Sequence, residues 1–212
     1  LPAPLLEALS PRQPRQLRAA DLSTAPWPTP AAAAAKYQRG RLLLLAGSDA
    51  YRGAALLSLL GASASGLGSL RAALPEAVAD QLWNQLPHAV LAAKLPSHSD
   101  GSLDLRALPP SALERLDAVV LGPGIGQRRA DDEIWEQLQT FPGLLVLDAD
   151  GLNRLAQRPA GPWLQGRRGP TWLTPHRGEF QRLFPHLSDR PPLEASAAAR
   201  DQSGCAVLRK GA

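Results

Sequence analysis

The chain has 212 residues, of which 44% are hydrophobic and 20% are charged, and its formal net charge is +4. These proportions are typical of a soluble globular protein with a substantial core. No apolar run approaches the roughly 20 residues of a membrane-spanning helix. No basic run is interleaved with aromatic residues, which argues against a nucleic-acid partner.

The start of the chain lacks the features of a secretory signal, and Cys205 is its single cysteine. One cysteine excludes an internal disulfide and fits a reducing cytoplasm, and the apolar context of Cys205 predicts a small core residue. There is no methionine in the chain, and its end follows an apolar, strand-like run. We therefore expect a fragment, cut or processed at both ends.

Residues 1–35 are rich in proline and alanine, and prolines at 26, 28 and 30 forbid a regular helix or central strand. This stretch predicts a linker or arm, and residues 36–212 form the predicted domain. Strands are expected within 41–48, 67–74, 88–95, 117–121, 144–147, 171–174 and 205–212. Helices are expected within 49–66, 75–86, 108–116, 131–141, 151–158, 177–184 and 191–202. The alternation predicts an α/β fold with a mostly parallel, helix-covered sheet.

Small residues open the first of these helices and recur along it, which would let it approach a sheet or a ligand closely. They are Gly53, Ala54, Ala55, Gly61, Ala62 and Ala64. The helix within 108–116 is expected to begin at Ser111, because Glu114 follows at the spacing of a capping box.

The glycine-rich segment GPGIG, from Gly122 through Gly124 to Gly126, follows a predicted strand. Its backbone N–H groups would suit a phosphate or pyrophosphate. It is not a dinucleotide fingerprint, because Gln127 stands where a glycine is required, and Gly61–Leu67 lacks the lysine of a Walker A loop. The alternative is a tight turn without a ligand.

Two carboxylates, Asp148 and Asp150, follow the short apolar strand at 144–147. In an open α/β sheet, ligands bind beyond the carboxyl ends of the strands, so both acids are expected at a crevice. If the extended conformation persists, they share one face. Alternatively, one acid caps the next helix and the other is solvated.

The segment TPHRGEF (174–180) carries His176 beyond another strand end, where it faces the same crevice or is an ordinary loop histidine. Glu179 would cap the following helix or contact a ligand. Lys210 would meet a nucleotide phosphate or remain solvated. The other histidines, at 88, 98 and 186, have no evident partner, and no HExxH or paired CxxC points to a structural metal site.

The order of these segments adds to each of them. Lys36 with Gly40, then RLLLLAGSDAYRGAALL, LDAVVLGPGIG, VLDADGLN, LTPHRGEF and AVLRKG closely resemble the NAD(P)H-hydrate dehydratase family from about Lys36 to Ala212. In bifunctional repair enzymes this family forms the carboxy-terminal domain. The resemblance implies a ribokinase-like, three-layer α/β/α sandwich, incomplete here at its C-terminus.

The implied activity returns the 6-hydroxylated, hydrated form of NADH or NADPH to the reduced cofactor. Bacterial-type members use ADP, giving AMP and phosphate, and eukaryotic members use ATP; Mg²⁺ is expected with the nucleotide. By resemblance, Ala54, Gly126 and His176 would contact the hydrated cofactor, with Gly122, Gly124, Asp150, Asn153 and Glu179 lining the same crevice. Lys210, Gly211 and Ala212 match the start of a KGxxT stretch that binds the nucleotide.

The sequence departs from the family at two places. The catalytic aspartate is expected in a later GTGD motif that lies beyond Ala212, so no catalytic residue is assigned and the chain is expected to be inactive. The family's RxGAG segment is altered to ASASGLG at 62–68. The resemblance also implies a homo-oligomer and an upstream epimerase domain. Two alternatives stay open: a ribokinase-like kinase of a vitamin precursor, or a non-catalytic nucleotide-binding module.

Overall fold

The computed structural model describes residue 20 and residues 35–82, 89–128 and 132–211. The predicted arm at 1–35 lies almost entirely outside these residues, as do His88 and Ala212, so the predicted boundary between arm and domain stays a prediction. The described fold is that of the unit Ala35–Ala212.

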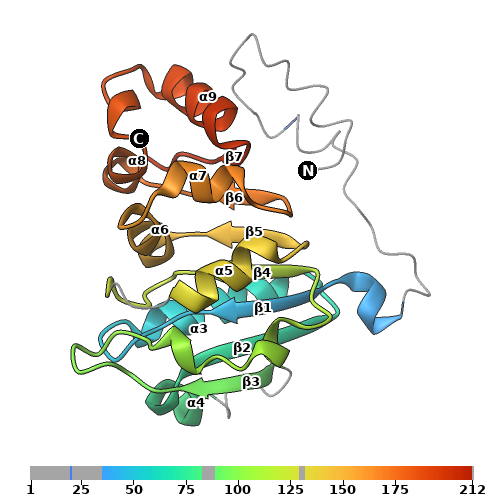
Figure 1. The fold of residues 1–212 in the computed structure, drawn as a ribbon. Helices are drawn as coiled ribbons and strands as arrows, with labels where there is room; N and C mark the ends of the chain where they lie inside the picture. The colour runs from blue at the N-terminus through green and yellow to red at the C-terminus, as the bar shows by residue number, and fades with distance from the viewer. Residues whose placement is uncertain (1–19, 21–34, 83–88, 129–131, 212) are drawn as a thin grey trace. The chain divides into compact units, whose positions relative to one another are not determined.

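A seven-stranded sheet forms the middle of this unit, in the order β3-β2-β1-β4-β5-β6-β7 (Figure 1). Every paired strand runs parallel to its neighbour, which confirms the predicted parallel sheet. The strands are apolar because both faces of such a sheet are covered. They are β1 (Arg41–Leu45), β2 (Ser69–Pro75), β3 (Val90–Leu95), β4 (Ala118–Leu121), β5 (Leu144–Leu147), β6 (Thr171–Leu173) and β7 (Ala206–Val207).

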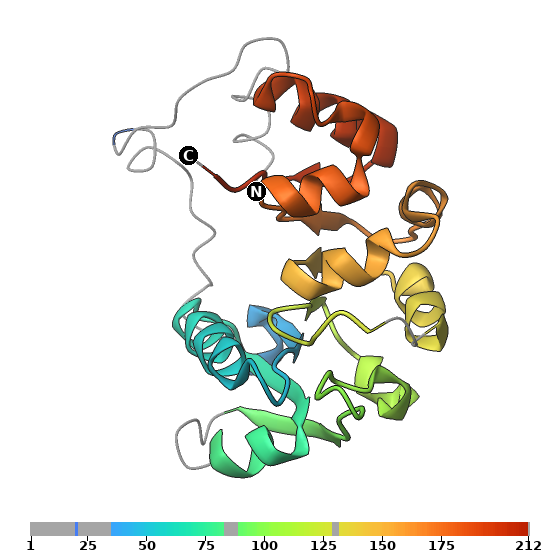
Figure 2. The ribbon, with the colours of Figure 1, turned by 90° about the vertical axis from the view of Figure 1, so that its left-hand side faces the viewer.

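Helices cover both faces, and two separate apolar cores result (Figure 2). Strand β1 supplies both cores, because Leu43 and Leu45 face one side and Leu44 faces the other. The smaller core packs against α3 and α4, and the larger one against α5, α6, α8 and α9. The α-helices are α3 (Arg52–Ala64), α4 (Glu76–Leu82), α5 (Asp132–Thr140), α6 (Ala149–Ala156), α7 (Ala160–Gln165), α8 (Arg177–Leu183) and α9 (Pro192–Ser203).

Short 3₁₀ turns connect these elements, and one of them replaces a predicted helix. Residues Pro110–Leu113 form only the turn η3, and its N-cap residue is Pro109 rather than the predicted Ser111. Glu114 ends it in an extended conformation and Arg115 has a φ of 56°, so no capping box forms. Residues 159–170, which lie between a predicted helix and a predicted strand, contain α7. The other 3₁₀ turns are η1 (Lys36–Arg39), η2 (Leu105–Ala107) and η4 (Pro185–Leu187).

The strand register determines where the segments that follow the strands meet. Leu121 pairs with Leu45 on one side and with Leu147 on the other, and Leu147 pairs in turn with Leu173. The residues that follow these partners therefore lie along one edge of the sheet. The strand order also reverses between β1 and β4, which is the point where open α/β sheets bind ligands.

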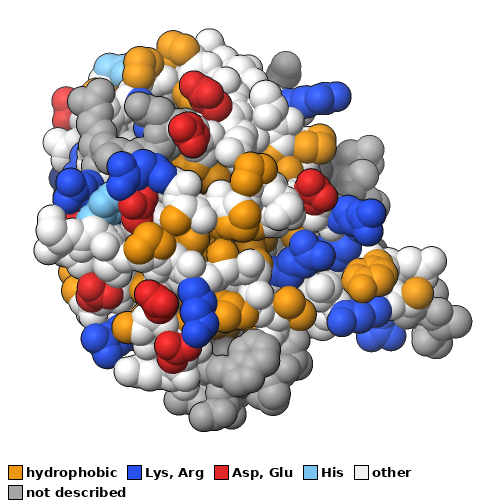
Figure 3. Space-filling view, turned by 60° about the horizontal axis from the view of Figure 1, so that its bottom comes forward, with side chains coloured by type: hydrophobic (Ala, Val, Ile, Leu, Met, Phe, Trp, Pro, Cys, Tyr) orange, Lys and Arg blue, Asp and Glu red, His pale blue; other side chains and the backbone are white. Residues whose placement is uncertain are grey.

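Within the described residues, no helix combines the length and apolar character needed to cross a membrane. Seen with the β3–α4 end turned forward, the surface carries basic and acidic side chains that alternate with apolar ones (Figure 3). Among the described residues visible on this face, the basic side chains do not form a continuous stripe of the kind that follows a nucleic-acid backbone.

Candidate active site

The carboxyl ends of the strands form one edge of the sheet, and three predicted site segments meet there. They are GPGIG (122–126), DAD (148–150) and TPH (174–176). Gly122, Asp148 and Thr174 are the first residues after the register partners Leu121, Leu147 and Leu173. The backbone continues the pairing one step further, since Asp148 N–H donates to Leu121 O (3.1 Å) and Thr174 N–H donates to Leu147 O (3.1 Å). The predicted convergence of these segments is confirmed.

The extended conformation does not persist past Asp148, so the condition under which the two aspartates would share one strand face is not met. Ala149 has a φ of 46°, so the chain turns sharply after Asp148 and enters α6. Asp148 stands at the N-cap position without a side-chain capping bond, whereas Asp150 lies in the first helical turn and is buried. The alternative fails as well, because neither acid acts as the cap and Asp150 is not solvated.

The glycines of GPGIG are required by backbone conformation and by close packing. Gly122, Gly124 and Gly126 have φ values of 131°, 68° and 80°, which side chains rarely adopt. A Cβ on Gly122 would lie 1.9 Å from Asp148 O, and one on Gly126 would lie 2.4 Å from Ser102 Cβ. The loop therefore fits tightly against the start of α6 and against the segment around Ser102.

The N–H groups of this loop bind the protein itself, which corrects the predicted phosphate cradle. Gly122 N–H donates to Leu45 O (3.1 Å), and Ile125 N–H donates to Gly122 O (3.3 Å). Gly126 N–H donates to Oδ2 of Asp150 (2.9 Å). Proline has no N–H at position 123, so most of the loop's donors are already used.

Ala54, at the start of α3, meets the same loop from the other side of the β1–β4 reversal. A Cβ on Gly124 would lie 2.7 Å from the Cβ of Ala54 and 2.7 Å from that of Tyr51. Ala55 packs equally closely, 2.9 Å from a Cβ placed on Gly47. Close packing of this helix is therefore seen at Ala54 and Ala55, whereas a Cβ added at Gly53 or Gly61 would meet open space.

His176 and Glu179 cap α8 together. Nδ1 of His176 accepts from the N–H groups of Gly178 (2.9 Å) and Glu179 (3.4 Å), and the His176 N–H donates to Oε2 of Glu179 (2.9 Å). Because Nδ1 is an acceptor, Nε2 carries the proton and faces Oε1 of Glu179 at 3.1 Å. Glu179 is buried, while the His176 side chain is 54% exposed at the edge of the sheet.

Lys210 is neither free nor simply solvated. Its Nζ pairs with Oδ1 of Asp148, which also accepts from the hydroxyl of Thr174 (2.8 Å). Its backbone N–H donates to Pro175 O (2.8 Å). The predicted nucleotide-binding lysine thus lies next to the acidic strand end, and it would have to exchange a carboxylate for a phosphate on binding.

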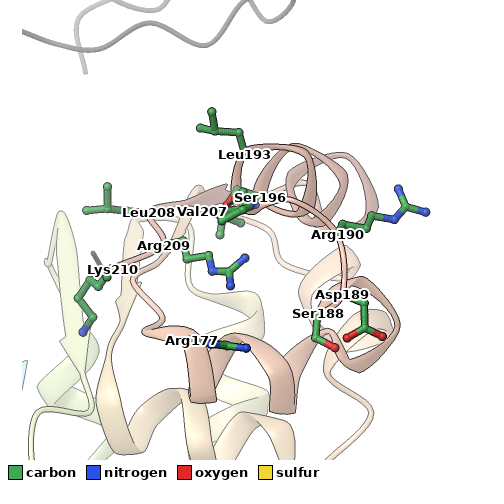
Figure 4. A pocket seen from close by; sticks show the side chains of 12 residues that line it. Arg177, Ser188, Asp189, Arg190, Leu193, Ser196, Val207, Leu208, Arg209 and Lys210 are labelled. Carbon is green, nitrogen blue, oxygen red and sulfur yellow. Dashed lines mark hydrogen bonds between the residues drawn. The ribbon is translucent and has the colours of Figure 1, made fainter.

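A cavity of about 720 Å³ opens beside Lys210, between α8, the start of α9 and the segment after β7. Figure 4 shows the Arg209 guanidinium projecting into it above Arg177. Arg209 stacks on Phe180, 4.7 Å from the ring centre, and its Nη1 is buried without a hydrogen-bond partner. The charged lining residues are Arg177, Asp189, Arg190, Arg209 and Lys210, so positive charge dominates.

His98, His186 and Cys205 have neighbours of their own, and His88 lies outside the described residues. Nε2 of His186 lies 2.8 Å from Oε1 of Gln202, and His98 Nε2 lies 3.5 Å from Oδ1 of Asp104, so both have neighbours that sequence did not reveal. Hydrogen bonds from Arg106 lower the pKa of Asp104. Cys205 is buried, as predicted, and burial raises the pKa of its thiol.

Comparison with known proteins decides the family. A profile of NAD(P)H-hydrate dehydratases matches residues 42–212, which is most of the chain. The chain belongs to the NAD(P)H-hydrate dehydratase family. It is 42% identical over 177 residues to the bifunctional NAD(P)H-hydrate repair enzyme Nnr of Synechocystis and 45% identical over 184 residues to that of Gloeobacter violaceus. These matches cover 84% and 85% of this chain but 33% and 34% of the relatives, so it spans about a third of their length.

Solved structures agree with the family and the fold. The ADP/ATP-dependent NAD(P)H-hydrate dehydratase of Bacillus subtilis, co-crystallized with ATP and Mg²⁺, is 30% identical with a TM-score of 0.63. That match covers 85% of this chain and 61% of the Bacillus chain. A ribokinase-like protein of Enterococcus faecalis, 22% identical over 85% of this chain and 60% of its own, has a TM-score of 0.67 and supports the fold.

Sequence reasoning missed the arginines of this site. Arg154 binds the GPGIG loop, and Arg182 binds Asn153. The cavity is lined by three more arginines, Arg177, Arg190 and Arg209. Arg154 lies four residues after Asp150, a spacing that places both side chains on one helix face. That spacing was the available signal. The cavity arginines come from separate segments that only the fold brings together.

Proposed function

We propose that the protein of which these residues are part dehydrates hydrated NADH and NADPH, using ADP as the phosphoryl donor. The observation that carries the proposal is that GPGIG, DAD and TPH lie together at one edge of the sheet. The chain that carries them belongs to the NAD(P)H-hydrate dehydratase family. The phosphoryl group of ADP would pass to the ring hydroxyl, leaving AMP. Phosphate would then leave with the carbon–oxygen bonding electrons while the neighbouring ring carbon loses a proton.

In this proposal the hydrated nicotinamide lies over the GPGIG loop, between Ala54 and His176. Asp150 and Asn153 support that loop from below, because both are buried and bonded within the protein. Gly122 and Gly124 shape the loop, and Glu179 orients the exposed ring of His176. The base that takes the hydroxyl proton is not assigned among residues 1–212.

The cavity beside Lys210 is the proposed nucleotide site. Its size falls within the range of small-ligand pockets, and Arg177, Arg190 and Arg209 give it the positive charge that a diphosphate requires. Gly211 lines the cavity as well. Ala212, which was also predicted to bind the nucleotide, lies outside the described residues. Mg²⁺ would arrive with the phosphates. We assign it no protein ligand, since the described residues include no cluster of three or more metal-ligating side chains.

The decisive assay uses the complete gene product that contains these residues. Hydrated NADH is incubated with Mg²⁺ and either ADP, ATP or no nucleotide, and the near-ultraviolet absorbance of the reduced nicotinamide is followed. We expect recovery with ADP and none without a nucleotide. Phosphorylation of a vitamin precursor by ATP, with no recovery of NADH, would instead establish the kinase. Nucleotide binding without either turnover would establish a non-catalytic module.

Three further features belong to the same proposal. An epimerase domain upstream is supported by the bifunctional relatives, of which this chain matches about a third. A homo-oligomer and a cytoplasmic location are proposed from the family resemblance and from the single, buried cysteine. Light scattering on the complete gene product tests the oligomer.

A further inference from the structure

One turn of α6 binds the peptide groups on both sides of Gly126 in the GPGIG loop, the Ile125–Gly126 group through its N–H and the Gly126–Gln127 group through its carbonyl. Oδ2 of Asp150 accepts the Gly126 N–H at 2.9 Å, and Nε of Arg154 donates to Gly126 O at 2.7 Å. The two side chains are four residues apart and therefore lie one above the other on the helix. Together they set the orientation of the backbone on both sides of Gly126.

Arg154 also ties the loop to a third segment of the chain. Its Nη2 donates to Ile125 O (2.9 Å) and to Leu103 O (2.9 Å), and the Leu103 N–H donates to the same Ile125 carbonyl (2.8 Å). The residue is only 2% exposed. A buried guanidinium of this kind is costly to disturb, because each carbonyl that loses its donor stays desolvated.

The same turn is linked to α8. Nη1 of Arg182 donates to Oδ1 of Asn153 (2.7 Å), and Nδ2 of Asn153 donates to Oδ1 of Asp150 (3.3 Å). Helix α8 begins directly after His176. A continuous path of hydrogen bonds therefore runs from the helix capped by His176 to the peptide of Gly126.

We propose that Arg154 is a positioning residue, which with Asp150 fixes the backbone at Gly126 against the hydrated nicotinamide. Gly126 has a φ of 80° and carries no side chain, so its own conformational preference does not define this geometry. The loop would be preorganised by α6 rather than by its sequence. The part of the inference that concerns the substrate rests on the proposed function, and the part that concerns the loop does not.

The first measurement needs no turnover. Amide hydrogen exchange of the peptide covering residues 122–126 is compared in the wild type, Arg154→Gln, Arg154→Lys and Arg167→Gln. Arg167 is the matched control, because it also donates to several carbonyls, among them Phe141 O (2.8 Å) and Gly143 O (3.1 Å), but at the amino ends of the strands. We expect about tenfold faster exchange in Arg154→Gln, an intermediate rate in Arg154→Lys and wild-type exchange in Arg167→Gln.

The second measurement is the kinetics of the same variants in the complete gene product. Arg154→Gln should raise KM for hydrated NADH by about tenfold while KM for ADP stays within about twofold, and Arg154→Lys should recover part of the loss. Arg167→Gln should lower thermal stability without this split. Unchanged exchange in folded Arg154→Gln, or an equal rise of both KM values, would overturn the inference. A wild type that does not turn over would refute the proposed function and leave the exchange result to judge the loop.

Discussion

Gly126 is a residue of the site that is constrained both by its backbone conformation and by its packing. It combines a φ of 80° with a close contact at Ser102, so a methyl group there is strained and collides. Gly126→Ala should lower the free energy of unfolding by about 1–3 kcal/mol. Gly61→Ala is the control, because Gly61 lies within α3 with open space around it and should gain about 0.5–1 kcal/mol. Denaturant titration measures both, and equal effects would refute the packing argument.

Asp117 is the residue whose charge links stability to acid pH. Its carboxylate accepts from Arg41 N (2.8 Å), Nε (3.0 Å) and Nη2 (2.9 Å), and these bonds hold its pKa below the ordinary 3.8. A carboxyl with a lowered pKa in the folded state contributes stability above the pKa of the unfolded chain, and loses it as pH falls through the folded value.

We therefore expect Asp117→Asn to destabilise the protein near neutral pH but to reduce the loss of stability on acidification below about pH 4. The measurement is the unfolding midpoint as a function of pH. Asp201→Asn serves as the control, because Asp201 pairs with its exposed neighbour Arg200 and such exposed pairs contribute little stability. A wild-type acid dependence in Asp117→Asn would contradict the assignment.

At the scale of elements, substitutions at the N-cap of α8 can distinguish a structural role of His176 from a contact with substrate. His176→Ala removes the acceptor for the Gly178 and Glu179 N–H groups and should cost about 1 kcal/mol of stability. His176→Asn keeps a good N-cap residue and should recover most of that stability. If His176 also contacts substrate, both variants lose activity. An Asn variant with full activity would restrict His176 to capping.

Most strands and helices could be predicted from short sequence patterns, because these elements depend mainly on neighbouring residues. Apolar runs such as Leu144–Leu147, bounded by Pro-Gly or by glycines, predicted the parallel strands, and their order placed the three site segments at one edge. The helix over residues 108–116 failed because two adjacent prolines and the positive φ of Arg115 outweighed its capping pattern. The side of the chain on which Asp150 lies could not be predicted either, because the positive φ of Ala149 ends the extended conformation before Asp150.

The sequence did not reveal which hydrogen-bond partners the polar groups of the site have in the folded protein. A glycine-rich loop shows that its N–H groups are accessible in principle, but whether Asp150 already occupies one depends on the tertiary fold. The same holds for Lys210, whose partner Asp148 lies 62 positions earlier in the chain. The arginines of the cavity come from α8, from the segment before α9 and from the segment after β7, so no local pattern unites them.

At the scale of the whole molecule, the predicted boundary of the domain can be tested by truncation. Removing residues 1–34 should leave the unfolding midpoint unchanged, because the unit Ala35–Ala212 holds the sheet and both cores. Removing residues 1–40 should lower stability by about 1–2 kcal/mol, since the Gly68 N–H bonds to Arg39 O and Gly40 O, and the Ser69 N–H to Gly40 O. Equal loss in both truncations would place the boundary earlier.

The position of β4 beside β1 has a consequence for how the protein is made. Leu42 pairs with Ala118, so the middle of the sheet closes only after β2 and β3 have been synthesised. At a translation rate of about 5–20 residues per second, β1 waits roughly 4–15 s for this neighbour. During that interval β1 to β3 can pair, while one edge of β1 and the leucines of the larger core stay uncovered. We therefore expect the uncovered edge of β1 to be the part of the nascent sheet most prone to wrong pairing until β4 has been synthesised.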